Sequence, residues 1–147
     1  MLTIAYIGNG KSTNRYHLPF STKLKDKITI KTIYSPSGKI TWDKIPNVNY
    51  TKDINDIYED PEIQLVVVTT PSPLHFELGK EALEHGKNVL IEKPFTETSA
   101  EAKELFRLAE EKGLFVQCYQ NRRYDSDFLT VQKVIESGVL GDLLEVE

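Results

Sequence analysis

Residues 2–13 read LTIAYIGNGKST, an apolar, β-branched run that leads directly into a turn with two glycines. The run Leu2–Ile7 predicts a strand, and Gly8 and Gly10 match the first two glycines of the turn that binds a dinucleotide. Gly8 permits the tight turn, and Gly10 lets the backbone approach a pyrophosphate at the start of a helix. Thr13 replaces the third glycine of this pattern, so we expect the next helix to lie farther from the strand or to begin later.

Lys11 and Ser12 follow Gly10, and these three residues also match the end of a phosphate-binding P-loop. That motif needs another glycine five positions before Gly10, where this chain has Ala5 inside the predicted strand. The mismatch disfavours a nucleoside triphosphatase. We therefore assign Lys11, Ser12 and Thr13, together with the two glycines, to a candidate dinucleotide site. A turn that binds no ligand is the alternative that this loop alone leaves open.

Short apolar runs alternate with segments of helical periodicity along the rest of the chain. We predict further strands at 28–34, 64–69, 88–91 and 114–119, and helices at 53–60, 72–85, 98–112 and 126–137. This alternation is typical of βαβ units and of an α/β fold with a doubly wound, mostly parallel sheet. The ligand site of such a Rossmann-like sheet lies beyond the carboxyl ends of its strands.

Several of these helices carry signals for their ends. Ser72 is a candidate N-cap, and Thr98 with Glu101 forms a capping box on a helix that Gly113 should end. In the last predicted helix, three apolar residues recur at helical spacing and are expected to face inward: Phe128, Val131 and Ile135. The segment Leu143–Glu147 then predicts the beginning of another strand.

The composition is that of an ordinary globular domain, since 39% of the 147 residues are hydrophobic and 27% are charged. Eighteen basic and 22 acidic side chains give a net charge of −4, which argues against nucleic-acid binding because such domains usually carry a basic excess. No apolar stretch approaches the ~20 residues of a membrane span. The single Cys118 excludes an internal disulfide, and the three histidines stand apart from ligand-spaced carboxylates, so no metal is expected. We expect a cytoplasmic protein with small-molecule partners, no nucleic acid and no membrane.

The end of the second predicted strand bears on the choice between NAD and NADP. An acidic residue at this place accepts the ribose hydroxyls of NAD. Here the chain reads Tyr34-Ser35-Pro36-Ser37-Gly38-Lys39, and no Asp or Glu occurs in residues 28–41. The hydroxyl of Ser35 and the cation of Lys39 suit a 2′-phosphate better, so NADP is slightly favoured. A simple turn is the competing interpretation.

Further motifs lie at the ends of the third, fourth and fifth predicted strands. They are Thr70–His75, the turn Gly86–Val89, the element Glu92-Lys93-Pro94 and the stretch Gln120–Tyr124. With the opening glycines, these segments resemble the glucose-fructose oxidoreductase, inositol dehydrogenase and rhizopine-catabolism family, known as the Gfo/Idh/MocA family. The resemblance runs from Leu2 to the end of the chain, and the Glu-Lys-Pro element after a strand is its most specific part.

The resemblance implies roles for residues at these strand ends. Lys93 corresponds to the family lysine that lies beside the nicotinamide and the substrate, where it assists proton transfer, so Lys93 is the candidate catalytic and substrate-binding residue. Glu92 would contact the nicotinamide ribose. Thr70, Pro71 and His75 would line the path of the cofactor, although a histidine in the first turn of a helix can also simply cap or pack.

Asn121, Arg122 and Arg123 follow the last predicted strand, so we expect them to face the same cleft. Asn121 is a candidate cofactor contact, and the two arginines are candidates for holding an oxygen-rich substrate. Equally, these residues could tie two domains together.

Members of the family are usually much longer and carry a second α/β domain that forms the floor of the substrate site. We therefore predict a dinucleotide-binding domain at 1–122 and, at 123–147, a linker helix and the first strand of a truncated C-terminal domain. The resemblance implies an NAD(P)-dependent oxidoreductase that acts on a sugar, cyclitol or related polyol and forms a homo-oligomer at full length. The chain alone should bind a dinucleotide without turning over substrate. A non-catalytic dinucleotide-binding or sensing module is the alternative.

Overall fold

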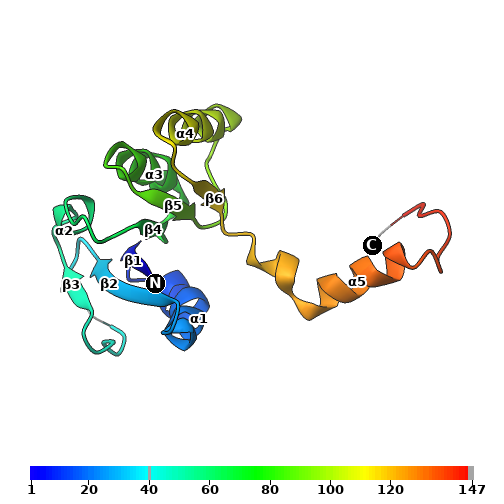
Figure 1. Ribbon diagram of the computed structural model, residues 1–147, viewed down its shortest axis with the longest axis horizontal. Helices are drawn as coiled ribbons and strands as arrows, with labels where there is room; N and C mark the ends of the chain where they lie inside the picture. The colour runs from blue at the N-terminus through cyan, green and yellow to red at the C-terminus, as the bar shows by residue number, and fades with distance from the viewer. Residues whose placement is uncertain (40, 146–147) are drawn as a thin grey trace.

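The computed structural model describes residues 1–39 and 41–145, and these residues contain one sheet of six parallel strands. The order across the sheet is β3-β2-β1-β4-β5-β6 (Figure 1). The strands are β1 (Leu2–Ile7), β2 (Ile28–Tyr34), β3 (Asn49–Thr51), β4 (Leu65–Val68), β5 (Asn88–Ile91) and β6 (Val116–Cys118). This is the doubly wound order of a Rossmann fold, so the predicted fold class is confirmed.

The register of the strands brings their carboxyl ends to one edge of the sheet. Ile7 at the end of β1 pairs with Tyr34 of β2 and with Val68 of β4. Val68 in turn pairs with Ile91 of β5, and Ile91 pairs with Cys118 of β6. The residues that follow these strands are therefore neighbours, although up to 110 positions separate them in the chain.

Helices cover the two faces of the sheet unequally (Figure 1). The helices α2 (Asn55–Tyr58), α3 (His75–Glu84) and α4 (Ser99–Lys112) pack on one face, where the larger of two apolar clusters lies. Strand residues alternate between the faces, because Ala5 and Ile7 belong to this cluster whereas Ile4 and Tyr6 belong to the other. The second face is covered by the helical turns η1 (Thr13–His17), α1 (Leu18–Ser21) and η2 (Thr22–Leu24).

The predicted ends of the helices are confirmed in one case and wrong in another. At α4, Thr98 and Glu101 form the reciprocal capping box, and Gly113 adopts a left-handed conformation with a φ of 66°. At α3, by contrast, the side chain of Ser72 caps nothing. A 3₁₀ turn, η3 (Ser72–Leu74), stands there instead, and α3 begins only at His75. Of the two consequences expected of Thr13, the later helix start is wrong, because helical backbone after the glycine turn begins at Lys11.

The chain leaves the sheet after β6 through the turn η4 (Asn121–Tyr124) and continues into α5 (Ser126–Glu136) (Figure 1). The predicted inward positions in α5 are wrong for the described residues, because Phe128, Val131 and Ile135 are all at least 37% exposed. Leu140 and Leu143 line a hollow with Val131 and Ile135, but these contacts leave the side chains largely open to solvent. Residues 143–145 form no strand, and the rest of the predicted strand lies outside the described residues. The proposed division of the chain at residue 122 stays a prediction.

Within residues 1–39 and 41–145, no helix combines the length and the apolar character that crossing a membrane requires.

Candidate dinucleotide-binding site

The turn after β1 depends on the absence of a side chain at Gly8. Its φ is +120°, a conformation that L-amino acids rarely adopt, and its N–H donates to the carbonyl of Tyr34 over 3.0 Å. A Cβ at this position would lie 2.7 Å from Thr69 Oγ1 and 3.0 Å from the Thr69 backbone. The turn therefore requires glycine both for its conformation and for the close approach of β4.

Replacing Gly8 with alanine should destabilise the fold by about 2 kcal/mol, because the variant combines backbone strain with an overlap against Thr69. Urea denaturation of the wild type and of Gly8→Ala measures the difference. Gly10→Ala is the matched control, because a Cβ at Gly10 meets no atom within 4 Å. Equal urea midpoints for Gly8→Ala and the wild type would show that alanine causes no strain at this position.

Thr13 takes the place of the third glycine through hydrogen bonds. Its side chain is fully buried, and its Oγ1 donates to the carbonyl of Gly8 over 2.8 Å. The same oxygen lies 2.7 Å from Thr69 Oγ1. Threonine therefore joins the helix to the glycine turn and to the end of β4, and the helix starts without delay despite the β-branched side chain.

Two features at the carboxyl edge of the sheet favour ligand binding: open space at the glycine turn and an unpaired polar group. The space where a Cβ of Gly10 would stand is open, so the backbone of the turn can be approached closely. Next to β4, the hydroxyl of Thr70 is buried and has no hydrogen-bond partner among the described residues. Buried polar groups are almost always paired, so an unpaired hydroxyl beside an open glycine turn fits a site that a polar ligand completes. Pro71, which follows Thr70, is exposed at the same edge.

A small hollow of about 70 Å³ follows β2, and Ser35 and two lysines among its lining residues could bind an anion. The hydroxyls of Ser35 and Ser37 lie 3.3 Å apart, and the backbone N–H of Lys39 donates to Ser37 Oγ over 3.2 Å. Lys39 and Lys52 both line the hollow. Lys52 was not predicted from the sequence because it follows β3, a strand of three residues that no apolar run indicates. A Cβ at Gly38 would overlap the side chain of Lys52, so the absence of one lets this lysine reach the turn.

The carboxylate of Glu92, directly after β5, accepts three hydrogen bonds. Ser12 Oγ donates to its Oε1 over 2.6 Å, and His17 Nε2 lies 2.8 Å from the same oxygen. The backbone N–H of Lys93 donates to Oε2 over 3.0 Å. Burial alone would raise the pKa of Glu92, but the hydrogen bonds from His17, Ser12 and Lys93 lower it from 4.5 to about 2. Glu92 is therefore a fixed anion, with acceptor capacity left on Oε2.

Lys93 presents its ammonium group to solvent at the carboxyl edge of β5. Within residues 1–39 and 41–145, no carboxylate lies within ion-pair distance of its Nζ. A cation in this place is available to a bound molecule rather than engaged in holding the fold.

His75 links two strand ends. Its ring is 1% exposed, with Nδ1 2.7 Å from the carbonyl of Pro94 and Nε2 2.9 Å from the carbonyl of Thr70. Both ring nitrogens thus contact backbone, and the ring has no surface left for a ligand. The structure places His75 behind the Thr70 and Glu92-Lys93-Pro94 segments, where it fixes them relative to each other.

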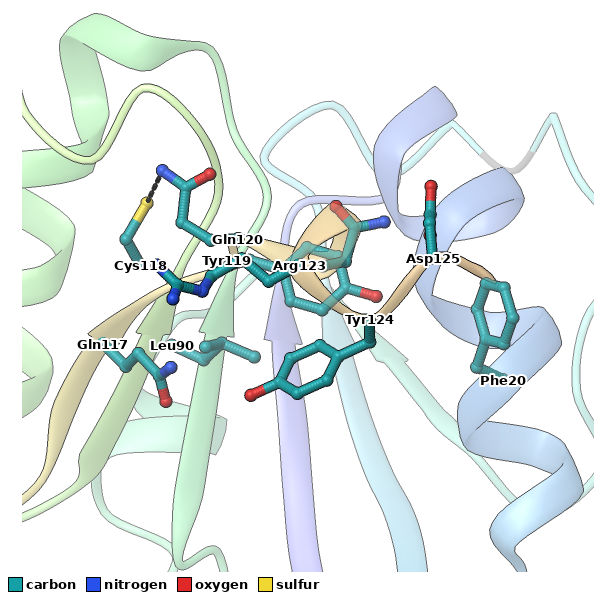
Figure 2. Close-up of a pocket in the computed structure, with 10 residues that line it drawn as sticks. Phe20, Leu90, Gln117, Cys118, Tyr119, Gln120, Arg123, Tyr124 and Asp125 are labelled. Atoms are coloured by element: carbon teal, nitrogen blue, oxygen red, sulfur yellow. Dashed lines mark hydrogen bonds between the residues drawn. The ribbon is translucent and has the colours of Figure 1, made fainter. Parts of the chain in front are cut away.

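The residues after β6 face a cavity of about 480 Å³ on the face of the sheet that α1 covers only in part (Figure 2). Asn121 and Arg123 line it, together with Phe20, Tyr119 and residues of β5 and β6. Arg122 does not line this cavity and pairs instead with Asp125 over 3.3 Å. Lys93 is not among the lining residues, and the cleft that Lys93 was expected to share with the two arginines stays a prediction. In the described part of the chain, no three metal-ligating side chains cluster.

His17 is the second residue that the sequence analysis missed. It was considered only as a metal ligand, yet it is 4% exposed and bonded to Glu92, which lies 75 positions away in the chain. Neither spacing nor periodicity connects the two residues, so only the fold reveals the contact.

The fold and the glycine turn define a nucleotide-binding domain of the Rossmann class. A family model described as "Oxidoreductase family, NAD-binding Rossmann fold" matches residues 2–120. The chain therefore belongs to the Gfo/Idh/MocA family and contains the NAD-binding domain of an oxidoreductase, as its motifs predict.

Known relatives extend beyond this chain. It is 51% identical over 150 residues to the uncharacterized oxidoreductase YhhX of Escherichia coli, an alignment that covers 100% of this chain and 43% of YhhX. It is 37% identical over 142 residues to scyllo-inositol 2-dehydrogenase (NADP(+)) IolW of Bacillus subtilis, covering 97% of this chain and 39% of IolW. A crystal structure of a probable oxidoreductase yhhX superposes with a TM-score of 0.93 at 49% identity, over 98% of this chain and 42% of that one. The chain thus spans about two fifths of the length of these relatives.

Proposed function

We propose that this chain forms the cofactor-binding part of an NADP-preferring oxidoreductase that acts on a sugar, cyclitol or related polyol. The observation that carries the cofactor preference is the end of β2, where the hydroxyl of Ser35 and two lysines line one hollow, and no carboxylate is among the described residues that line it. A 2′-phosphate is an oxygen-rich dianion, so cations stabilise it and a carboxylate would repel it. The name of the relative IolW, which includes NADP(+), agrees with this preference.

The dinucleotide would cross the carboxyl edge of the sheet. Its 2′-phosphate would lie against Ser35, Lys39 and Lys52, and its pyrophosphate against the backbone near Gly10, with Lys11 and Ser12 at the start of the helix. Contacts with the nicotinamide half would come from Thr70, Pro71 and the remaining acceptor capacity of Glu92, and Asn121 is a further candidate. The fit rests on the open space above Gly10 and on the unpaired hydroxyl of Thr70.

A bound nicotinamide dinucleotide supplies the hydride acceptor or donor that oxidation of a hydroxyl or reduction of a carbonyl needs. Lys93 supplies the polar chemistry. Its ammonium group would donate a hydrogen bond to the substrate oxygen, stabilise negative charge that develops there and hold the proton at Nζ. Glu92 fixes the backbone of Lys93 through the N–H bond and keeps a negative charge beside it.

We extend this proposal to the other residues of the substrate site. Arg123 lines the cavity after β6, and Arg122 lies nearby on the same turn, so both are proposed to act on substrate or at a domain contact. The relatives are longer than this chain, and we propose that further residues from the full-length homo-oligomer complete catalysis. The isolated chain should therefore bind NADPH but not oxidise polyols.

The cofactor preference is tested by parallel titrations with NADPH and NADH, followed by nicotinamide fluorescence. Lys39→Ala should weaken NADPH binding about 10-fold, because one charge-assisted contact to the phosphate is lost, and should change NADH binding less than about 2-fold. Lys103→Ala, which removes an exposed lysine from α4, is the matched control and should change neither. Wild-type protein that binds NADH as tightly as NADPH would refute the proposed preference.

A further inference from the structure

His17 stands at a point where three segments of the site meet. One short helical segment separates His17 from the glycine turn. Its ring lies between the edge of Tyr6 in β1 and the face of Tyr119 after β6. The centroid distances are 5.8 Å to Tyr6 and 4.1 Å to Tyr119. With 4% of its surface exposed, the ring is held in one orientation that aims Nε2 at Glu92.

The contact between His17 and Glu92 also affects Lys93, because Glu92 binds the backbone of Lys93. His17 Nε2 and Ser12 Oγ hold one carboxylate oxygen, at 2.8 and 2.6 Å, and the other oxygen accepts the backbone N–H of Lys93. A carboxylate with both oxygens bound has little freedom to rotate, so the Lys93 backbone is fixed by a side chain from the other half of the domain. Ser12 belongs to the glycine turn, and the same carboxylate therefore joins the pyrophosphate side of the site to its nicotinamide side.

We infer that His17 is a positioning residue, which acts through Glu92 to hold Lys93 in place beside the nicotinamide. The placement of Lys93 beside the nicotinamide rests on the function proposed above, whereas the bonds of His17 stand on the structure itself. His17 needs only a hydrogen on Nε2 for this role, so it serves as donor and touches neither cofactor nor substrate.

Two amide variants separate this role from simple packing. Glutamine ends at about the reach of His Nε2 and can still donate to Glu92, whereas asparagine is one methylene shorter and cannot. Both remove the ring from its stack with Tyr119, so a purely structural role predicts the same result for both. The positioning role predicts that His17→Gln behaves like the wild type and that His17→Asn does not.

The first measurement is amide hydrogen exchange at Lys93 by NMR, without any cofactor. We expect roughly 10-fold faster exchange in His17→Asn, near wild-type exchange in His17→Gln, and no change at amides in the core of β1. Unchanged exchange at Lys93 in His17→Asn, or equal acceleration in both variants, would overturn the inference. If His17→Asn does not fold, Glu92→Gln removes an acceptor oxygen at constant size and should accelerate the same amide.

The second measurement compares two probes by calorimetry: NADPH and adenosine 2′,5′-bisphosphate, which lacks the nicotinamide half. His17→Asn should weaken NADPH about 10-fold and the bisphosphate less than about 2-fold. Equal losses for both probes would show a general structural role and overturn the inference. Faster Lys93 exchange combined with unchanged NADPH binding would support the clamp on Lys93 and refute the proposed placement of the nicotinamide beside it.

Discussion

Gly10→Val should abolish binding of both NADPH and NADH, with a loss of at least about 100-fold, while the protein stays folded. A Cβ at Gly10 meets no protein atom within 4 Å, so the fold has room for the larger side chain. The same space is where a pyrophosphate would approach the backbone of the turn, and two methyl groups there would keep it away. The loss should be equal for the two cofactors, because both carry the pyrophosphate.

Nicotinamide fluorescence measures the affinities, and urea denaturation confirms that the variant is folded. Gly10→Ala is the graded control, which adds one methyl group and should lose less affinity than valine. Gly8→Ala differs from both, because its cost falls on stability through the contact with Thr69. A folded Gly10→Val that binds NADPH as the wild type does would mean that the glycine turn binds no pyrophosphate.

The second large effect is a dependence of stability on pH that Glu92 causes. Its pKa in the folded protein is about 2, well below the ordinary value of 4.5, because His17, Ser12 and the Lys93 N–H outweigh the effect of burial. A depressed carboxyl pKa stabilises the folded state above pH 4.5, and this contribution is lost as the pH falls toward 2. The full contribution is about 3 kcal/mol, of which about 2 kcal/mol is lost by pH 3.

Urea denaturation between pH 6 and pH 3 tests this dependence. The free energy of unfolding of the wild type should fall by about 2 kcal/mol more than that of Glu92→Gln, which has no charge to protonate. Glu136→Gln, at an exposed position on α5, controls for the loss of one carboxylate and should follow the wild type. Parallel curves for the wild type and Glu92→Gln would show that the carboxylate is not held as the structure indicates.

The features predicted correctly from the sequence are those that local patterns determine. The bounds of β1, β2 and β5 match, because each strand is a compact apolar run. The capping box of α4 and the left-handed Gly113 also match, since both depend on residues within four positions of one another. The parallel arrangement of the strands was predicted from the alternation of strands and helices along the chain.

The errors arose where distant contacts decide the structure. The strand β3 has only three residues, and it exists because it pairs with the end of β2. The apolar face of α5 was expected to point inward, but helical spacing does not reveal whether another element covers that face. Serine is a residue type that often caps helices, yet the chain enters α3 through a 3₁₀ turn, and the side chain of Ser72 caps no backbone N–H there.

For the same reason, only some residues of the candidate site could be predicted from the sequence. The turn residues Gly8 and Gly10 carry a local signal, and the structure puts them beside Thr70 and Glu92 at one edge of the sheet. For His75 the sequence left open both a place on the cofactor path and simple packing, and its ring contacts two backbone carbonyls. Lys52 carried no signal because it follows the three-residue strand β3, and His17 carried none because its partner Glu92 lies 75 positions away in the sequence.

A map of the NADPH-binding surface by chemical-shift changes in ¹H–¹⁵N NMR spectra tests the proposed cofactor site directly. We propose that the dinucleotide lies across the carboxyl ends of β1, β2, β4 and β5. We therefore expect the largest changes at the amides of Gly10, Lys39, Thr70 and Lys93. Changes confined to the cavity lined by Gln117 and Tyr124, with these four amides unmoved, would contradict the claim.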